Sequence, residues 1–224
     1  MHKKESTMTN AKFKKPFAVK GIMVTSPKGK AFWCKHSEPD RMYNPDGALS
    51  TNLVCDPGDP TVVAFIEKLE ALRDTALEET KTNLGDKAKT YTGRDVYSME
   101  YDKEGMETGN IIFKFTLKDI DKRKAADRQH TIDVLDAKTN RIDKPPLVGN
   151  GSVIRCAAYA NPYNNPNQKQ IGISLIWSKM QIIELQQYSG GGASDFEEED
   201  GFVAEKKEPV SDGFSNEEDD ELDF

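Results

Sequence analysis

Aromatic and basic side chains lie close together at several points in this sequence. Arg155 and Tyr159 are four residues apart in a strand-like segment, so both face the same way, and the opposite face holds only small or apolar residues. An extended nucleic acid needs cations for its phosphates and aromatic faces for its bases, each stacked base contributing roughly 1–3 kcal/mol. The pattern therefore predicts nucleic-acid binding, with the candidate residues Phe17, Lys20, Trp33, Lys35, Arg41, Tyr43, Lys114, Arg155, Tyr159, Tyr163 and Lys169.

Trp33 has a structural alternative to this role. It shares one side of its predicted strand with Ala31 and Lys35. Phe32 and Cys34 take the other side, so alternation alone leaves Trp33 open between a DNA-facing position and a core position.

The other aromatic residues are predicted more clearly as either core or exposed residues. Trp177 alternates in step with Ile173 and Leu175, which predicts a core position. The aromatic residues of the segment 111–117 are also expected in the core. Tyr163 lies in a stretch rich in Asn and Pro, which predicts an exposed loop residue.

Charge is divided unevenly along the chain. Residues 195–224 contain fourteen Asp or Glu and two Lys, a net charge of −12, and the whole chain carries −7, so residues 1–194 sum to +5. A polyanionic segment attached to a cationic body competes with any polyanion that this body binds. The five lysines of residues 1–15 are either a solubilising arm or further phosphate contacts.

Residues with the spacing of a catalytic or metal site are missing from the sequence. The three histidines are scattered, no CxxC accompanies the three cysteines, and Gly149-Asn150-Gly151 lacks the context of a phosphate-binding loop. A disordered acidic segment cannot fix the geometry of two-metal catalysis. We therefore expect no enzyme, no metal and no cofactor.

Composition also indicates the compartment. No apolar run has the length of a membrane span or the pattern of a secretion signal, and an odd number of unpaired cysteines suits reducing conditions. We expect a soluble protein of the cytoplasm, which is the host cell's cytoplasm if a phage encodes it.

Short strand patterns dominate residues 13–185. Strands are expected within 17–25, 30–36, 48–55, 110–118, 152–160 and 170–185, and residues 130–142 are expected to form a strand, a turn at Asn140 and a short return. One helix interrupts them: Asp59 is its predicted N-cap, Pro60 its first residue and Gly85 its end. Its acidic surface indicates a packing element rather than a DNA-facing one.

Residues 86–110 are expected to be a long polar connection, and residues 118–128 are expected to be a charged hairpin or mobile loop.

This order of elements predicts a mainly β protein with a single OB-fold, a small Greek-key barrel with one inserted α-helix. Residues 1–12 are expected to form a basic disordered arm and residues 13–188 the DNA-binding domain. Residues 189–224 are expected to be a glycine linker and an acidic disordered tail.

The sequence resembles the acidic-tailed single-stranded-DNA-binding proteins encoded by short-tailed lytic bacteriophages, over roughly Lys15 to Phe224. The order of several short motifs and the acidic tail ending in Asp-Phe carry the resemblance. These motifs are Asn44-Pro45-x-Gly47, Phe113-Lys114-Phe115, Val134-Leu135-Asp136, Pro146-x-x-Gly149-x-Gly151-Ser152, Pro162-Tyr163 and Glu184-Leu185 before the triple glycine.

The resemblance implies an OB-fold protein that coats and protects single-stranded DNA in phage replication, recombination and repair. It implies that Tyr163 contacts DNA and that the tail binds the phage or host DNA polymerase and the helicase-primase, with Phe224 as the important terminal aromatic residue. The tail residues concerned are Asp219, Asp220, Glu221, Asp223 and Phe224. Such proteins often form homodimers.

Two positions depart from the pattern of this family. Asn165 stands where a loop tryptophan is expected, and Asp46 stands where the Asn-Pro-x-Gly turn carries a basic residue. Arg41, Trp33 or Tyr159 is expected to take over the missing roles.

Our hypothesis from the sequence is a sequence-nonspecific single-stranded-DNA-binding protein whose tail competes with DNA and recruits replication proteins. Two alternatives remain open. One is a DNA mimic or anti-host inhibitor that acts through the acidic tail, and the other is a metal-dependent nuclease.

Overall fold

A computed structural model of the chain describes residues 15–42, 45–118 and 130–187. The chain divides into two units, Met1–Ser189 and Gly190–Phe224. The second unit lies outside the described residues, as do the expected basic arm and nearly all of the expected charged loop at 118–128. No helix in the described part has the length and apolar character needed to cross a membrane.

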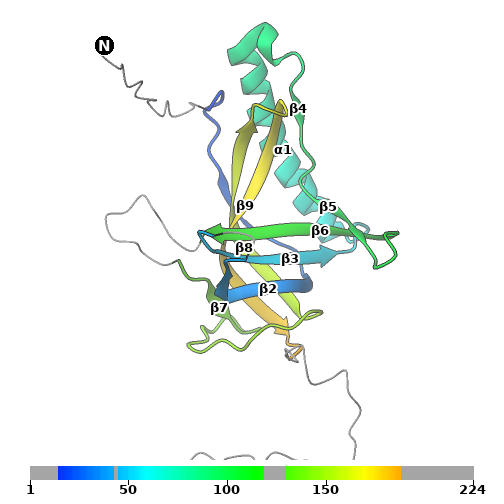
Figure 1. Ribbon diagram of the computed structural model, residues 1–224, viewed down its shortest axis with the longest axis vertical. Coiled ribbons are helices and arrows are strands. Elements are labelled where there is room, and N and C mark those ends of the chain that lie inside the picture. Colours follow the sequence, from blue (N-terminus) through cyan, green and yellow to red (C-terminus); the bar gives the residue numbers. More distant parts are fainter. Residues whose placement is uncertain (1–14, 43–44, 119–129, 188–224) are drawn as a thin grey trace, which may run out of the picture. The chain divides into compact units, whose positions relative to one another are not determined.

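Five strands close into a barrel (Figure 1). Around the ring the order is β2, β3, β6, β9, β8 and back to β2; β6 and β9 run parallel, and the other four pairs are antiparallel. This is the five-stranded arrangement that the prediction of an OB-fold requires. The strands are β1 (Ile22–Thr25), β2 (Gly29–Asp40), β3 (Ala48–Cys55), β4 (Thr92–Gly93), β5 (Ser98–Tyr101), β6 (Glu107–Lys118), β7 (Asp133–Leu135), β8 (Val153–Asn165) and β9 (Gln170–Glu184).

The barrel interior follows the alternation expected from the sequence. Every second residue of β3, β6 and β8 points inward, which leaves the intervening residues on an outer face. Trp177, Phe113 and Phe115 are almost completely buried, as predicted. The three cysteines are free thiols, and burial raises the pKa of Cys34 to about 11 and that of Cys55 to about 12, so these groups stay protonated near neutral pH.

Helix α1 (Pro60–Leu84) begins and ends where the sequence predicts. The Asp59 carboxylate accepts the Thr61 backbone N–H at 2.7 Å, Pro60 opens the first turn, and Gly85 ends the helix with a φ of 54°. Phe65 packs edge-on against Phe113 of the barrel, with ring centroids 5.1 Å apart. The helix is therefore a packing element, as expected, and a short 3₁₀ turn (Gly85–Ala88) follows it.

Two segments expected to be loops contain strands instead. Residues 86–110 hold β4, β5 and the start of β6, and β8 continues through residues 161–165, paired with the first residues of β9. Tertiary packing explains why these segments form strands. The β8–β9 hairpin extends beyond the barrel, where α1 and β4 pack beside it (Figure 1). Pairing over this length makes strands of residues whose composition favours a loop.

Candidate nucleic-acid interface

A groove opens on the outer face where β6 and β9 separate. In the described part of the chain these two strands pair at Phe115–Leu175 and Thr116–Ile176, after which β9 runs back toward the hairpin tip and β6 toward β5. Residues 94–98 border the space between them. The groove has a volume of about 560 Å³ and is lined by Arg94, Asp95, Val96, Tyr97, Ser98, Ile112, Lys114, Thr116, Tyr163, Ile173, Ser174 and Leu175.

Tyr163 is held in this groove by its neighbours. It pairs with Gly172 across the β8–β9 hairpin, and a Cβ atom at Gly172 would lie 2.6 Å from Cζ of the tyrosine ring. The ring thus occupies the space above a glycine. Tyr159 is placed in the same way, because a Cβ at Gly21 would lie 2.6 Å from its Cε1. Both tyrosines belong to the same face of β8, with about 13 Å of strand between them.

Arg94 brings a cation to Tyr163. Its guanidinium Nη1 donates to the Tyr163 hydroxyl at 3.3 Å, and its backbone N–H donates to the carbonyl of Ile171 at 2.8 Å. The carbonyl of Arg94 accepts from Nη1 of Arg73, on α1, at 3.2 Å. Both backbone groups of Arg94 are therefore anchored, one to β9 and one to the helix.

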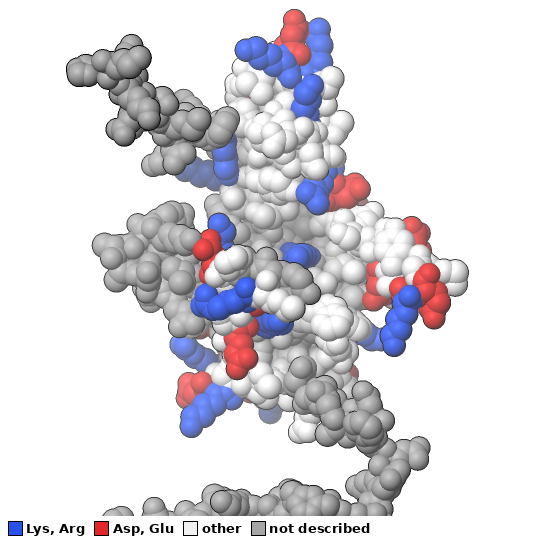
Figure 2. Space-filling view, in the orientation of Figure 1, with Lys and Arg blue, Asp and Glu red and all other residues white. Residues whose placement is uncertain are grey.

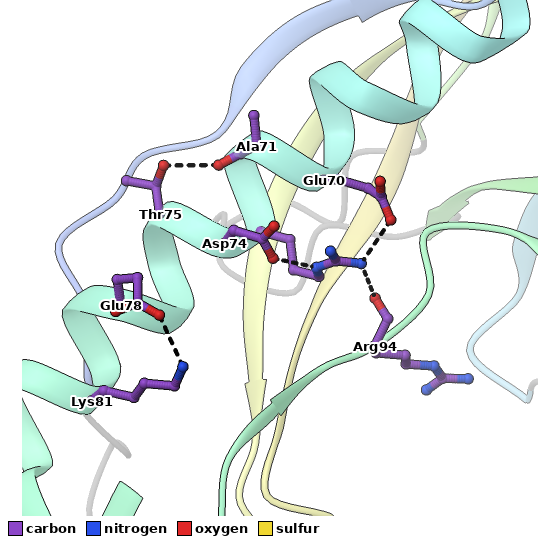
Figure 3. A network of polar contacts seen from close by, with 8 residues as sticks. Glu70, Ala71, Asp74, Thr75, Glu78, Lys81 and Arg94 are labelled. Carbon is purple, nitrogen blue, oxygen red and sulfur yellow. Dashed lines mark hydrogen bonds and ion pairs between the residues drawn. The ribbon is translucent and has the colours of Figure 1, made fainter. Parts of the chain in front are cut away.

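Arg73 is fixed in turn by two carboxylates of α1 (Figure 3). Its guanidinium meets Asp74 at 2.8 Å and Glu70 at 3.3 Å, and its side chain is only 12% exposed. The hydrogen bond to Asp74 raises the pKa of Arg73, which stays charged. Gly93 allows the approach, because a Cβ there would lie 2.6 Å from Nε of Arg73. The helix thus clamps the segment that carries Arg94 into the groove.

A row of cross-strand neighbours extends the groove over the outer face. Starting from Thr116 of β6, the pairing leads through Ile176 of β9 and Tyr159 of β8 to Met23 of β1. Met23 is 59% exposed, and Tyr159 and Ile176 are each 37% exposed. Adjacent strands lie about 4.8 Å apart, so these three residues form an apolar strip of roughly 10 Å leading from the groove.

The same row runs the other way through Ser50 to Lys35 of β2. Lys35 pairs with the Asp40 carboxylate at 3.5 Å. Lys114 lies in the groove itself and is exposed. Four of the residues predicted from the sequence, Lys35, Lys114, Tyr159 and Tyr163, are therefore brought to one face of the barrel.

Other candidates lie outside the groove. Arg155 shares the outer face of β8, and its Nε donates to the carbonyl of Ser26 at 3.1 Å. Lys20 is exposed immediately before Gly21, and Arg41 is exposed after β2. Lys169 is exposed in the turn between β8 and β9. Tyr43 and the tail residues Asp219, Asp220, Glu221, Asp223 and Phe224 lie outside the described residues.

Phe17 does not offer a stacking face. It is 6% exposed and packs with Ala76 and Leu77 of α1 and with Ile171 of β9. The Lys15 ammonium lies 5.3 Å from its ring centroid. The prediction for Phe17 is wrong because this residue anchors the segment before β1 to the helix.

Trp33 is exposed, but the prediction that it shares one side of its strand with Ala31 and Lys35 is wrong. The β2–β3 register shifts between Phe32 and Lys35, and Trp33 has a φ of 55°. Its backbone N–H donates to Oδ1 of Asn150 at 2.9 Å. Trp33 is therefore the extra residue of a β-bulge, so that Phe32 and Lys35 face outward, and Trp33 is 69% exposed.

Sequence reasoning missed Arg73 and Arg94 as parts of the site. Arg94 has tyrosines three residues before and after it, at positions 91 and 97, which is the interleaving of basic and aromatic residues used for Arg155. That signal was available but lay in a segment expected to be a connection. Arg73 carries no such signal, because its role depends on the packing of α1 against β4.

Acidic residues gather at the other end of β6. The hairpin of β5 and β6 carries Glu100, Asp102, Glu104 and Glu107, and Figure 2 shows this acidic cluster over the hairpin. This cluster makes the hairpin unfavourable for an anion, whereas Lys114 and Arg94 bring positive charge to the groove.

The closed five-stranded barrel with one inserted helix is an OB-fold, and basic and aromatic residues line a groove on its outer face. No protein-family model matches the chain. The expected resemblance to phage single-stranded-DNA-binding proteins rests on individual proteins.

Two phage proteins confirm that resemblance. The chain is 24% identical over 200 residues to the single-stranded DNA-binding protein of Enterobacteria phage T3, covering 84% of each chain. The structure is similar to the crystal structure of gp2.5, a single-stranded DNA-binding protein encoded by bacteriophage T7, with a TM-score of 0.56 and 23% identity. That match covers 83% of this chain and 100% of the other, which confirms the OB-fold. Both proteins are named for binding, in agreement with the expected non-enzymatic function.

Proposed function

We propose that this protein binds single-stranded DNA with little dependence on sequence, and that it coats and protects such DNA in phage replication, recombination and repair. The observation that carries the proposal is the groove in which Tyr163, Arg94 and Lys114 come together. Cations and an aromatic ring on a rigid scaffold suit phosphates and unpaired bases. The functions named for the T3 and T7 proteins support the same assignment.

We infer the path of the strand from the same groove and outer-face row. A base stacks on Tyr163, Lys114 and Arg94 neutralise neighbouring phosphates, and the strip of Ile176, Tyr159 and Met23 receives further bases. A duplex hides its base faces inside the stack, so the aromatic and apolar part of this surface contributes only with a single strand.

A salt-titrated binding experiment with the full chain tests this function. We expect tighter binding to oligo(dT) than to a duplex of equal length, and a logarithmic affinity that falls with the logarithm of the salt concentration. Arg94→Ala and Lys114→Ala each remove one phosphate contact, so each lowers the slope by about 0.7. Lys68→Ala, an exposed lysine of α1, loses the same charge and serves as the control.

Equal affinity for single and double strands, or equal slopes for the groove and control variants, would show that the groove is not the interface. If the chain binds no DNA at about 50 mM salt, where phosphate contacts are strong, the proposal fails altogether.

We also propose that the acidic tail competes with DNA and, once displaced, recruits the DNA polymerase and the helicase-primase. The charge of −12 on residues 195–224 against +5 on the remainder supports this exchange of one polyanion for another. Deletion of residues 195–224 is then expected to tighten DNA binding, with the larger gain at low salt. No gain at low salt would contradict competition. A chain that acts as a DNA mimic through its tail needs no DNA affinity in the rest of the molecule, which separates that alternative.

A further inference from the structure

We infer that Asp95 makes the groove prefer bases that carry an exocyclic amino group over thymine, an inference that rests on the DNA binding proposed above. Asp95 is the one acidic residue among those that line the groove, beside the cations Arg94 and Lys114. It is exposed, and neither an ion pair nor a side-chain hydrogen bond joins its carboxylate to another residue in the described ranges.

The backbone fixes the position of Asp95 in the groove. On one side, the N–H of Arg94 donates to the carbonyl of Ile171, and the carbonyl of Arg94 accepts from Arg73, the contact drawn in Figure 3. On the other side, Val96 is only 9% exposed and belongs to the barrel core. The carboxylate is therefore held where a bound strand passes, rather than on a free loop.

A carboxylate in this place is unfavourable for a groove that recognises phosphates alone. Its charge repels each phosphate and offsets part of the attraction of Lys114 and Arg94. An ionised carboxylate is only an acceptor, so its partners in a DNA strand are the N–H groups of the bases. Unpaired bases expose these edges when they stack on aromatic side chains such as Tyr163.

The four bases differ at these edges. Cytosine, adenine and guanine each carry an amino group that donates to an acceptor, and Asp or Glu accepts from N4 of cytosine in known protein–DNA contacts. Thymine has no amino group, and its one base donor, N3–H, lies between the acceptors O2 and O4, which the carboxylate repels. With Tyr163 stacking the base and Asp95 at its edge, the groove favours cytosine over thymine while it remains tolerant of sequence.

The test measures the affinity of the full chain for oligo(dC) and oligo(dT) of equal length at one salt concentration. We compare the wild type, Asp95→Ala, Asp95→Asn and, as a control, Glu104→Ala, which removes an exposed carboxylate from the β5–β6 hairpin. Comparing the dC-to-dT affinity ratio between variants cancels the stacking properties of the oligonucleotides themselves.

We expect Asp95→Ala to lower this ratio by about fivefold, the lower end of what a base-edge contact discriminates. Affinity for oligo(dT) is expected to rise, because a repulsive charge is gone. Asp95→Asn keeps an acceptor oxygen and is expected to retain part of the ratio, and Glu104→Ala to leave it unchanged. If Asp95→Ala raises both affinities by the same factor, or changes neither, the inference is wrong although DNA binding stands. If the wild type binds neither oligonucleotide, the proposed function fails first.

Discussion

Tyr163 and Trp33 are both aromatic residues on the outside of the same barrel, but different interactions hold their side chains in position. Tyr163 lies over Gly172, and its hydroxyl accepts a hydrogen bond from Arg94. Trp33 projects from a β-bulge, where its backbone has a φ of 55° and its N–H is bound by Asn150. Side-chain packing positions the first ring, and a left-handed backbone conformation exposes the second.

The two sites also differ in how much they lower the stability of the fold. The surroundings of Tyr163 hold the ring without a strained backbone, so a base meets a preorganised surface. A non-glycine residue in the left-handed region costs about 1–2 kcal/mol. Trp33 therefore exposes 69% of its surface at some expense in stability. We therefore expect the groove to contribute most of the proposed DNA binding and the bulge to contribute less.

The largest effect is expected at Tyr163. Tyr163→Ala removes the stacking surface and is expected to weaken binding to oligo(dT) by roughly 5- to 150-fold. Tyr163→Phe keeps the ring and loses only the hydrogen bond to Arg94, so a loss of about threefold or less is expected. Fluorescence anisotropy at fixed salt measures both, and an unchanged unfolding midpoint shows that the fold is intact. A loss as large for Phe as for Ala would mean that the hydroxyl, not the ring, carries the contact.

Much of the barrel could be predicted from the sequence because its information is local. The alternation of β3 and β6 identifies their buried faces, and Asp59, Pro60 and Gly85 bound the helix. These features depend on the period of a strand or on the capping of a helix, which neighbouring residues determine.

The site was harder to predict because its residues meet only after folding. Asn161 and Pro162 have loop propensities, yet pairing with β9 makes them part of a strand. At Trp33 one extra residue reverses the alternation, and nothing in the local pattern marks the bulge. The groove combines residues 94–98 and 173–175 with Ile112, Lys114, Thr116 and Tyr163, which propensity does not bring together.

A second prediction tests whether the helix positions the groove. Arg73→Lys keeps the positive charge and the helix propensity but loses the fork that holds Asp74, Glu70 and the Arg94 carbonyl. We expect a three- to tenfold weaker affinity, about 1 kcal/mol, and a salt slope reduced as in Arg94→Ala. A purely structural loss would lower stability without changing the slope.

The double variant Arg73→Lys, Arg94→Ala completes this test. If Arg73 acts through Arg94, its substitution has no further effect on affinity once Arg94 is gone. Additive losses in the double variant would contradict a positioning role, because Arg73 would then act on DNA binding by another route.

The smallest effect concerns the strained bulge, and three variants separate ring from backbone. Trp33→Ala removes the ring and keeps the strain, whereas Trp33→Gly removes both. We expect the Gly variant to be more stable than the Ala variant by about 1 kcal/mol, measured from urea midpoints at equal m-values. Both variants are expected to lose the same amount of DNA affinity, no more than about threefold. Thr139→Gly, at a φ of 68° in the turn after β7, serves as the control, with a gain in stability and no change in DNA binding. A loss of affinity at Trp33 as large as at Tyr163 would overturn the ranking of the two regions. Equal stability of the Ala and Gly variants would show instead that the backbone of the bulge is not strained. Solvent exposure of the Trp33 ring would then be the only destabilising feature of this site.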